Sequence, residues 1–162
     1  MMRIILLMFN VMALSITAIA QKSHRAYVEP FSVATPEGVV SKVNRTYKSA
    51  IDITDRTKCV FKSAKDQDSL GKAYNKFLME FGKFLSAHGF KWEQTTRCWN
   101  RIYFNADGYV DYYLFDFKTE ISNEKLLKYK ELFAEFSDTH KIGITASEGF
   151  AQCSPVTFQA DK

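Results

Sequence analysis

The stretch CWNRIYFNADGYVDYYLFDFK, residues 98–118, decides the fold, because it places two aromatic and β-branched runs around the tetrapeptide NADG. Runs of this composition favour strands. Asn105 can hydrogen-bond its own backbone at the entry of a turn, and Gly108 can take the left-handed conformation that closes it. The sequence therefore predicts a β-hairpin formed by residues 97–104 and 109–117.

The two faces of this hairpin are predicted to differ in character. Side chains alternate between the faces of a strand, so Ile102 and Arg101 point to opposite sides, as do Tyr112 and Tyr113. We assign Ile102 and Tyr112 to a core face, and we interpret the other face, which mixes rings with charges, as half-exposed. The residues predicted to bind a ligand or partner there are Trp99, Arg101, Tyr103, Tyr109, Asp111 and Tyr113.

Three helices are predicted from apolar residues that recur at steps of three and four. Thr35 and Ser122 are suitable N-cap residues for two of them, and Gly89 supplies a left-handed stop for the third. The predicted helices cover residues 36–51, 69–88 and 122–137.

A last strand is predicted over residues 150–158. Because Pro155 cannot donate to a strand ladder, it indicates either a sheet edge or the start of the strand. Together the elements predict one α+β domain over residues 21–162, with an antiparallel sheet of about four strands and two or three helices packed on one face. Residues 35–90 are expected to be mainly helical, and residues 97–158 to form the hairpin, a helix and the last strand.

The first twenty residues have the pattern of a secretory signal peptide. Arg3 precedes an apolar run, and the run ends in the small residues Ala18 and Ala20. We expect cleavage between Ala20 and Gln21, a periplasmic or secreted location, and no stable membrane insertion after cleavage. The alternative is an uncleaved anchor, because the run approaches the roughly 20 residues that a spanning helix needs.

Charge and cysteine content bear on two questions: whether the protein binds nucleic acid, and which disulfide bonds it can form. The net charge of +4 is spread along the chain without a basic block, so we expect no nucleic-acid partner. Cys59, Cys98 and Cys153 all follow the leader, where an oxidising compartment permits disulfides. An odd number leaves one thiol over. We favour a pair between Cys59 and Cys98, although the spacing does not choose it.

No motif of catalysis or cofactor binding stands out in the sequence. There is no Gly-rich phosphate loop, nucleophile elbow or metal-binding helix motif, so no cofactor, metal or catalytic residue is predicted. Cys153 could act as a nucleophile only if a base such as His140 reached it. We therefore expect a protein that is not an enzyme, with a small secreted hydrolase as the least favoured alternative.

Two short motifs resemble the C-terminal domain of TonB-type energy transducers and their TolA relatives. FNADGYV at residues 104–110 is similar to the hairpin turn of that family, and PVTF at residues 155–158 is similar to its closing strand. The resemblance covers residues 101–158. It implies a βαβ arrangement with a free sheet edge at residues 150–158, to which a partner strand could add.

The sequence thus favours an exported, non-enzymatic binding module that engages an envelope or secreted protein through a sheet edge or an aromatic face. The alternative is a small-ligand or glycan-binding protein that stacks sugars on Trp92, Trp99 and the tyrosines.

Overall fold

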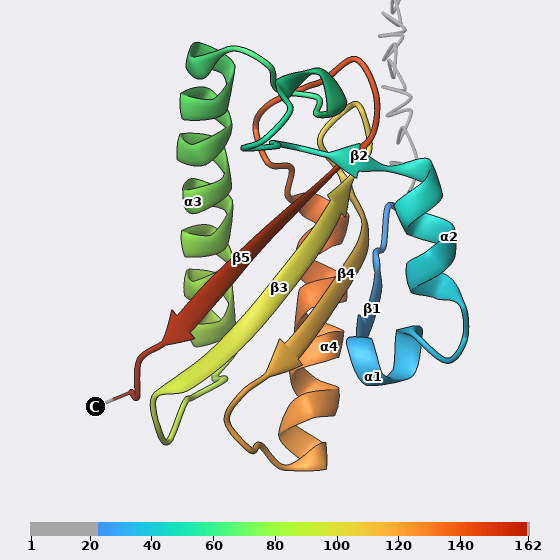
Figure 1. Ribbon diagram of the computed structural model, residues 1–162. Helices are drawn as coiled ribbons and strands as arrows, with labels where there is room; N and C mark the ends of the chain where they lie inside the picture. Colours follow the sequence, from blue (N-terminus) through green and yellow to red (C-terminus); the bar gives the residue numbers. More distant parts are fainter. Residues whose placement is uncertain (1–22, 162) are drawn as a thin grey trace, which may run out of the picture.

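A mixed five-stranded sheet in the order β1-β4-β3-β5-β2 forms the centre of the protein, in a computed structural model that describes residues 23–161 (Figure 1). The strands are β1 (Tyr27–Pro30), β2 (Lys48–Ser49), β3 (Thr96–Phe104), β4 (Val110–Phe117) and β5 (Phe150–Phe158). The helices are α1 (Phe31–Ala34), α2 (Val39–Thr46), α3 (Ala64–Ala87) and α4 (Asn123–Thr139), with a 3₁₀ turn at Arg56–Lys58.

The predicted α+β class is confirmed, whereas the predicted antiparallel sheet of about four strands is partly wrong. β3 lies antiparallel to β4 and β5, but β1 runs parallel to β4 and β2 runs parallel to β5. Parallel neighbours are joined through other elements and therefore pair across long distances in sequence. β1 and β2 are also too short to show alternation, so no local pattern marks them as strands.

The helix predicted over residues 36–51 is shorter and begins later. Gly38 takes a left-handed conformation with φ 74° immediately before α2, and Thr35 lies at the end of α1, not at the start of a longer helix. After Tyr47 the backbone becomes extended and forms β2. The predicted helix therefore combined the turn before Gly38, the whole of α2 and the residues of β2, and only residues 39–46 of it are helical.

The long helices α3 and α4 are capped by serines. The Ser63 hydroxyl accepts a hydrogen bond from the Asp66 N–H, so α3 begins earlier than predicted. The Ser122 hydroxyl accepts a hydrogen bond from the Lys125 N–H, which confirms the predicted start of α4. Each cap satisfies one of the amide groups that the first turn of a helix leaves without a partner.

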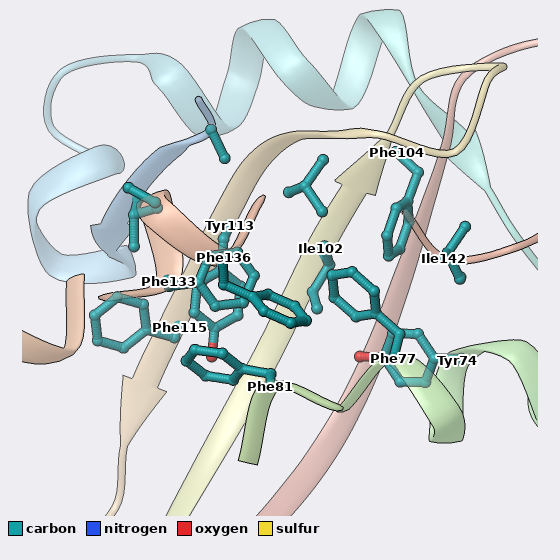
Figure 2. Close-up of a cluster of buried hydrophobic side chains, with 14 of the residues drawn as sticks. Tyr74, Phe77, Phe81, Ile102, Phe104, Tyr113, Phe115, Phe133, Phe136 and Ile142 are labelled. Atoms are coloured by element: carbon teal, nitrogen blue, oxygen red, sulfur yellow. The ribbon is translucent and has the colours of Figure 1, made fainter. Parts of the chain in front are cut away.

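Both long helices pack on one face of the sheet, which we call the first face and define by Ile102, Phe104, Tyr113 and Phe115. Figure 2 shows aromatic rings from α3, α4 and the sheet meeting there. The Tyr113 ring stacks on Phe133 with ring centres 3.8 Å apart. Large aromatic rings therefore fill much of the space between the helices and the sheet.

The opposite face, which we call the second face and define by Trp99, Arg101, Tyr103, Tyr112 and Leu114, is only partly covered. α1 and α2 pack over its Tyr103 end in a smaller apolar cluster that includes Ala34, Val43, Tyr103, Leu114 and Ala151. The prediction that the helices lie on one face is therefore wrong. In Figure 1, α3 and α4 lie behind the sheet, and no helix crosses the lower front of β3 and β5.

A β-bulge in β4 changes which side chains share a face. Phe104 pairs with Val110, but Tyr103 pairs with Tyr112, so Asp111 is an extra residue in the ladder. Beyond this point the alternation is reversed. Tyr113 faces the core with Ile102, and Tyr112 lies on the second face, which is the opposite of the prediction.

The predicted leader at residues 1–20 lies outside the described residues. Among residues 23–161, no helix combines the length and the apolar character that crossing a bilayer requires.

Candidate functional site

The structure distributes the six predicted binding residues over three places. Trp99, Arg101 and Tyr103 lie along the second face of β3, as predicted. Tyr109 and Asp111 lie at the turn and bulge of the hairpin. Tyr113 lies on the first face, where it is buried.

Tyr113 belongs to a buried polar cluster under α4. Its hydroxyl donates a hydrogen bond of 2.5 Å to the Asn100 side-chain carbonyl and lies 2.7 Å from the Tyr129 hydroxyl. Burial raises the pKa of both tyrosines well above the ordinary value. These groups are therefore held neutral inside the core, where a partner cannot reach them.

Tyr103 is also inaccessible, although it lies on the predicted face. Its side chain has 0% exposure beneath α2, and its hydroxyl donates to the Asn44 side-chain carbonyl at 3.0 Å. Burial raises its pKa. Tyr103 thus links β3 to α2 through this hydrogen bond and through packing.

Tyr109 and Asp111 contact His24, which lies in the segment before β1. The His24 ring stacks on Tyr109 with ring centres 4.6 Å apart, and its Nε2 lies 2.9 Å from the Asp111 carboxylate. The other Asp111 oxygen accepts a hydrogen bond of 2.5 Å from Tyr47, whose pKa is raised by burial and by that bond. These contacts join the segment before β1, the segment after α2 and the bulge.

The open end of the second face centres on Trp99, which keeps 42% of its surface exposed. Arg97 and Arg101 lie two residues to either side of it on the same face of β3. Across the sheet, Pro155 of β5 and Asp116 of β4 flank the indole. Asp116 forms an ion pair with Lys118, which leaves the two arginines as the local excess of charge.

β5 has a free edge beside this surface. β2 covers only Phe150 and Ala151, and the Ala50 N–H donates to the Ala151 carbonyl on the outer side at 2.8 Å. Because backbone groups alternate in direction along a strand, those of Cys153, Pro155 and Thr157 also point outward. We call the outer side of Gln152–Phe158 the free edge.

The free edge is partly blocked by its own residues. Pro155 has no N–H to donate, and the Gln152 side-chain amide donates to the Cys153 carbonyl at 3.0 Å. Pro155 therefore lies in the part of β5 that, among the described residues, has no neighbouring strand on its outer side, which agrees with the predicted edge position. The outward N–H groups of Cys153 and Thr157 remain, together with the carbonyls of Pro155 and Thr157.

A groove of about 250 Å³ runs between α3 and the free edge. We call it the edge groove. Its walls come mainly from apolar side chains, and the hydroxyls of Tyr74 and Ser154 share a hydrogen bond of 2.9 Å across it. The edge groove is lined by Ile51, Gln67, Leu70, Gly71, Tyr74, Asn75, Leu78, Gln152, Ser154 and Pro155.

Trp92, which the glycan alternative requires, is not on the same surface as Trp99. It is 6% exposed and stacks on Phe158 at 4.5 Å among the residues of the first face. A second groove of about 870 Å³ lies beside it, but Lys125 sits 5.7 Å above the indole and forms an ion pair with Glu93. The two tryptophans therefore do not form one stacking platform.

The residues considered for catalysis lie apart. Cys153 pairs with Arg101 on the second face, whereas His140 ends α4 and stacks on Phe136 at 4.0 Å. Burial raises the pKa of the Cys153 thiol. Cys59, Cys98 and Cys153 are free thiols in the structure, which does not contain the favoured pair between Cys59 and Cys98. Residues 23–161 contain no group of three or more histidine, cysteine or acidic side chains that could hold a metal.

Sequence reasoning missed Arg97 and the edge groove. Arg97 could have been found, because it precedes Trp99 by two residues and so shares its face. The edge groove could not, because α3 and β5 are distant in sequence. Comparisons with protein-family models, curated proteins and solved structures give no match.

Proposed function

We infer that this protein is a non-enzymatic binding module that takes an extended segment of a protein partner as an additional strand along β5. The observation that carries the proposal is the free edge, because β2 covers only the first two residues of β5. The remainder of β5 presents backbone donors and acceptors that no other strand uses within residues 23–161. Such an edge is a template for strand addition.

The edge groove supports the same function. Main-chain hydrogen bonds give strand addition its affinity, whereas pockets for alternate side chains give it specificity. The lining residues Gln152 and Ser154 come from the free edge itself, and Leu70 and Leu78 come from α3. Alternate side chains of an added strand would therefore enter an apolar groove.

Pro155 limits what can be added. Since it presents no N–H at the middle of the free edge, an added strand has donors only from Cys153 and Thr157 on either side. Natural sheets use edge prolines to suppress unselective pairing. The free edge is therefore suited to a partner whose side chains supply the rest of the binding energy.

Two sequence features support the proposed class of partner: the predicted leader, and the resemblance to TonB and TolA C-terminal domains. A leader at residues 1–20 would direct the domain to the periplasm or beyond. The resemblance adds a family in which a free edge of this kind is expected. We propose an envelope or secreted protein as the partner.

Replacing Thr157 tests the proposed function. Thr157→Pro removes an outward N–H, whereas Thr157→Val keeps it and changes only the exposed side chain. The full tagged chain should retain envelope proteins from a detergent extract, and Thr157→Pro should lose them while Thr157→Val keeps them. Thermal melts of both variants check that the fold is intact. Equal retention by the two variants would contradict the use of the free edge.

A further inference from the structure

We propose that the segment bound along β5 is acidic on alternate residues, and that Arg97 and Arg101 recognise its carboxylates on either side of Trp99. This inference rests on the proposed function and names the chemistry of the partner. It starts from the observation that neither arginine has an acidic partner among residues 23–161. The nearby Asp116 is paired with Lys118.

The register places both arginines next to the free edge. Arg97 pairs with Thr157, and Arg101 pairs with Cys153. The β5 side chains between the arginines and an added strand are therefore short. Neighbouring strands lie about 4.8 Å apart, so an added strand would run about 10 Å from β3. An extended arginine and a glutamate can together span that distance across a small residue.

Arg101 is incompletely satisfied in the structure. Its Nε is buried and has no hydrogen-bond partner among the described residues, while its guanidinium lies 5.4 Å from the centre of the Tyr103 ring. Buried polar groups normally find hydrogen-bond partners, because leaving such a group unpaired destabilises the protein. A carboxylate is the partner that the guanidinium fork fits best.

Trp99 separates the two positive charges with an exposed ring. The three side chains follow one another at every second residue, so they are about 7 Å apart along the strand. An added strand has the same spacing, which lets its alternate side chains meet Arg97, Trp99 and Arg101 in turn. Two carboxylates at positions i and i+4 of the added strand would therefore match the guanidinium groups of Arg97 and Arg101.

The intervening side chains of the added segment would point to the first face. There they meet the edge groove, whose walls include Leu70 and Leu78. Apolar side chains fit these walls, because they bury surface without leaving a polar group unpaired. The geometry therefore specifies a segment that alternates acidic and apolar residues, in contrast to a general polyanion.

Synthetic peptides test this specificity with the full chain. Three labelled nonapeptides of equal length alternate valine with glutamate, with serine or with lysine, and fluorescence anisotropy measures their Kd. The Glu–Val peptide should bind about tenfold more tightly than the Ser–Val peptide at low salt, and the difference should shrink as salt rises. The Lys–Val peptide should bind most weakly.

Charge reversal at the two arginines provides the matched comparison. Arg97→Glu with Arg101→Glu should reverse the preference, so that the Lys–Val peptide binds more tightly than the Glu–Val peptide. Arg25→Glu with Arg45→Glu changes the net charge equally at exposed positions and should leave the preference unchanged. Arg97→Glu alone, at an exposed position, covers the case in which the double variant does not fold, and should weaken Glu–Val binding several-fold.

The outcomes separate this inference from the proposed function. Equal binding of the Ser–Val and Glu–Val peptides would overturn the acidic preference and leave strand addition standing. The inference would also be overturned if no peptide bound, or if dextran sulfate competed as well as unlabelled Glu–Val peptide for the labelled Glu–Val peptide. In either case the comparison of Thr157→Pro with Thr157→Val would still test the proposed function. Glu–Val binding that persists in Thr157→Pro would count against both.

Discussion

Gly108 shows how one residue can determine a turn and a packing contact together. It takes φ 86° at the end of the NADG turn, where its N–H donates to the Asn105 carbonyl. A Cβ atom at this position would lie 2.6 Å from the Ile144 carbonyl oxygen. Residues near 144 come back from beyond α4 and rest on the turn, so only a hydrogen atom fits there.

Replacing Gly108 should therefore cost more than replacing another left-handed glycine. Gly143 has φ 77° with open space around its Cα, so Gly143→Ala should cost only the strain of the conformation, about 1 kcal/mol. Gly108→Ala adds to the same strain a clash with the Ile144 carbonyl oxygen. We therefore expect it to lower the free energy of unfolding by at least twice as much as Gly143→Ala. Urea unfolding monitored by fluorescence measures both. Equal losses would show that the Ile144 loop moves away freely.

At the scale of elements, the bulge in β4 decides which of two adjacent tyrosines enters the core. Tyr113 is buried with hydrogen bonds to Asn100 and Tyr129. Tyr112 lies on the second face against Tyr27 and Tyr47, and its hydroxyl makes no hydrogen bond to the described residues. A regular ladder would exchange the two side chains.

Removing each hydroxyl in turn tests this assignment. Tyr113→Phe leaves the Asn100 carbonyl without its strongest donor, and we expect a loss of about 1–3 kcal/mol in the free energy of unfolding. Tyr112→Phe removes a hydroxyl that has no partner among residues 23–161 and should change that free energy by less than about 0.5 kcal/mol. The pair of substitutions is chemically identical. A larger loss for Tyr112→Phe would place the bulge elsewhere.

At the scale of the whole molecule, the core between the helices and the sheet buries several weak acids in their neutral form. Burial raises the pKa of Cys98 from 9.0 to about 12, and it raises the pKa values of Tyr74, Tyr113 and Tyr129. In the unfolded chain these groups ionise near their ordinary pKa values. Between the two pKa values of a group, the unfolded state therefore binds fewer protons than the folded state.

Stability should consequently fall at alkaline pH. The contribution of Cys98 is complete below pH 9 and is lost as the pH rises toward about 12, at about 1.4 kcal/mol for each pH unit. The buried tyrosines add to the loss above their ordinary pKa of 10.0. Urea unfolding at pH 8, 9, 10 and 11 measures the trend. Cys98→Ala should reduce the slope between pH 9 and 10, and an unchanged slope would contradict a buried neutral thiol.

Local features could be predicted because their causes lie close together in the sequence. The hairpin turn, the Ser122 cap, the last strand and the apolar faces of the two long helices each depend on residues within a few positions. Trp99 and Arg101 were placed on the correct face for the same reason, since alternation along β3 is uninterrupted. Arg97 follows from the same alternation.

What the sequence alone determined is thus the hairpin, the last strand, the two long helices and much of the surface of β3. Only the tertiary structure decided the two parallel strands, the reversed face of Tyr113, the cover of α1 and α2 over Tyr103, and the groove beside the free edge. The reason is physical. The parallel strands pair, and an edge stays open, according to which distant segments meet a strand, and those contacts leave no pattern in the residues of the strand itself. The bulge lies within the hairpin, but the strict alternation used to assign the faces does not reveal one extra residue.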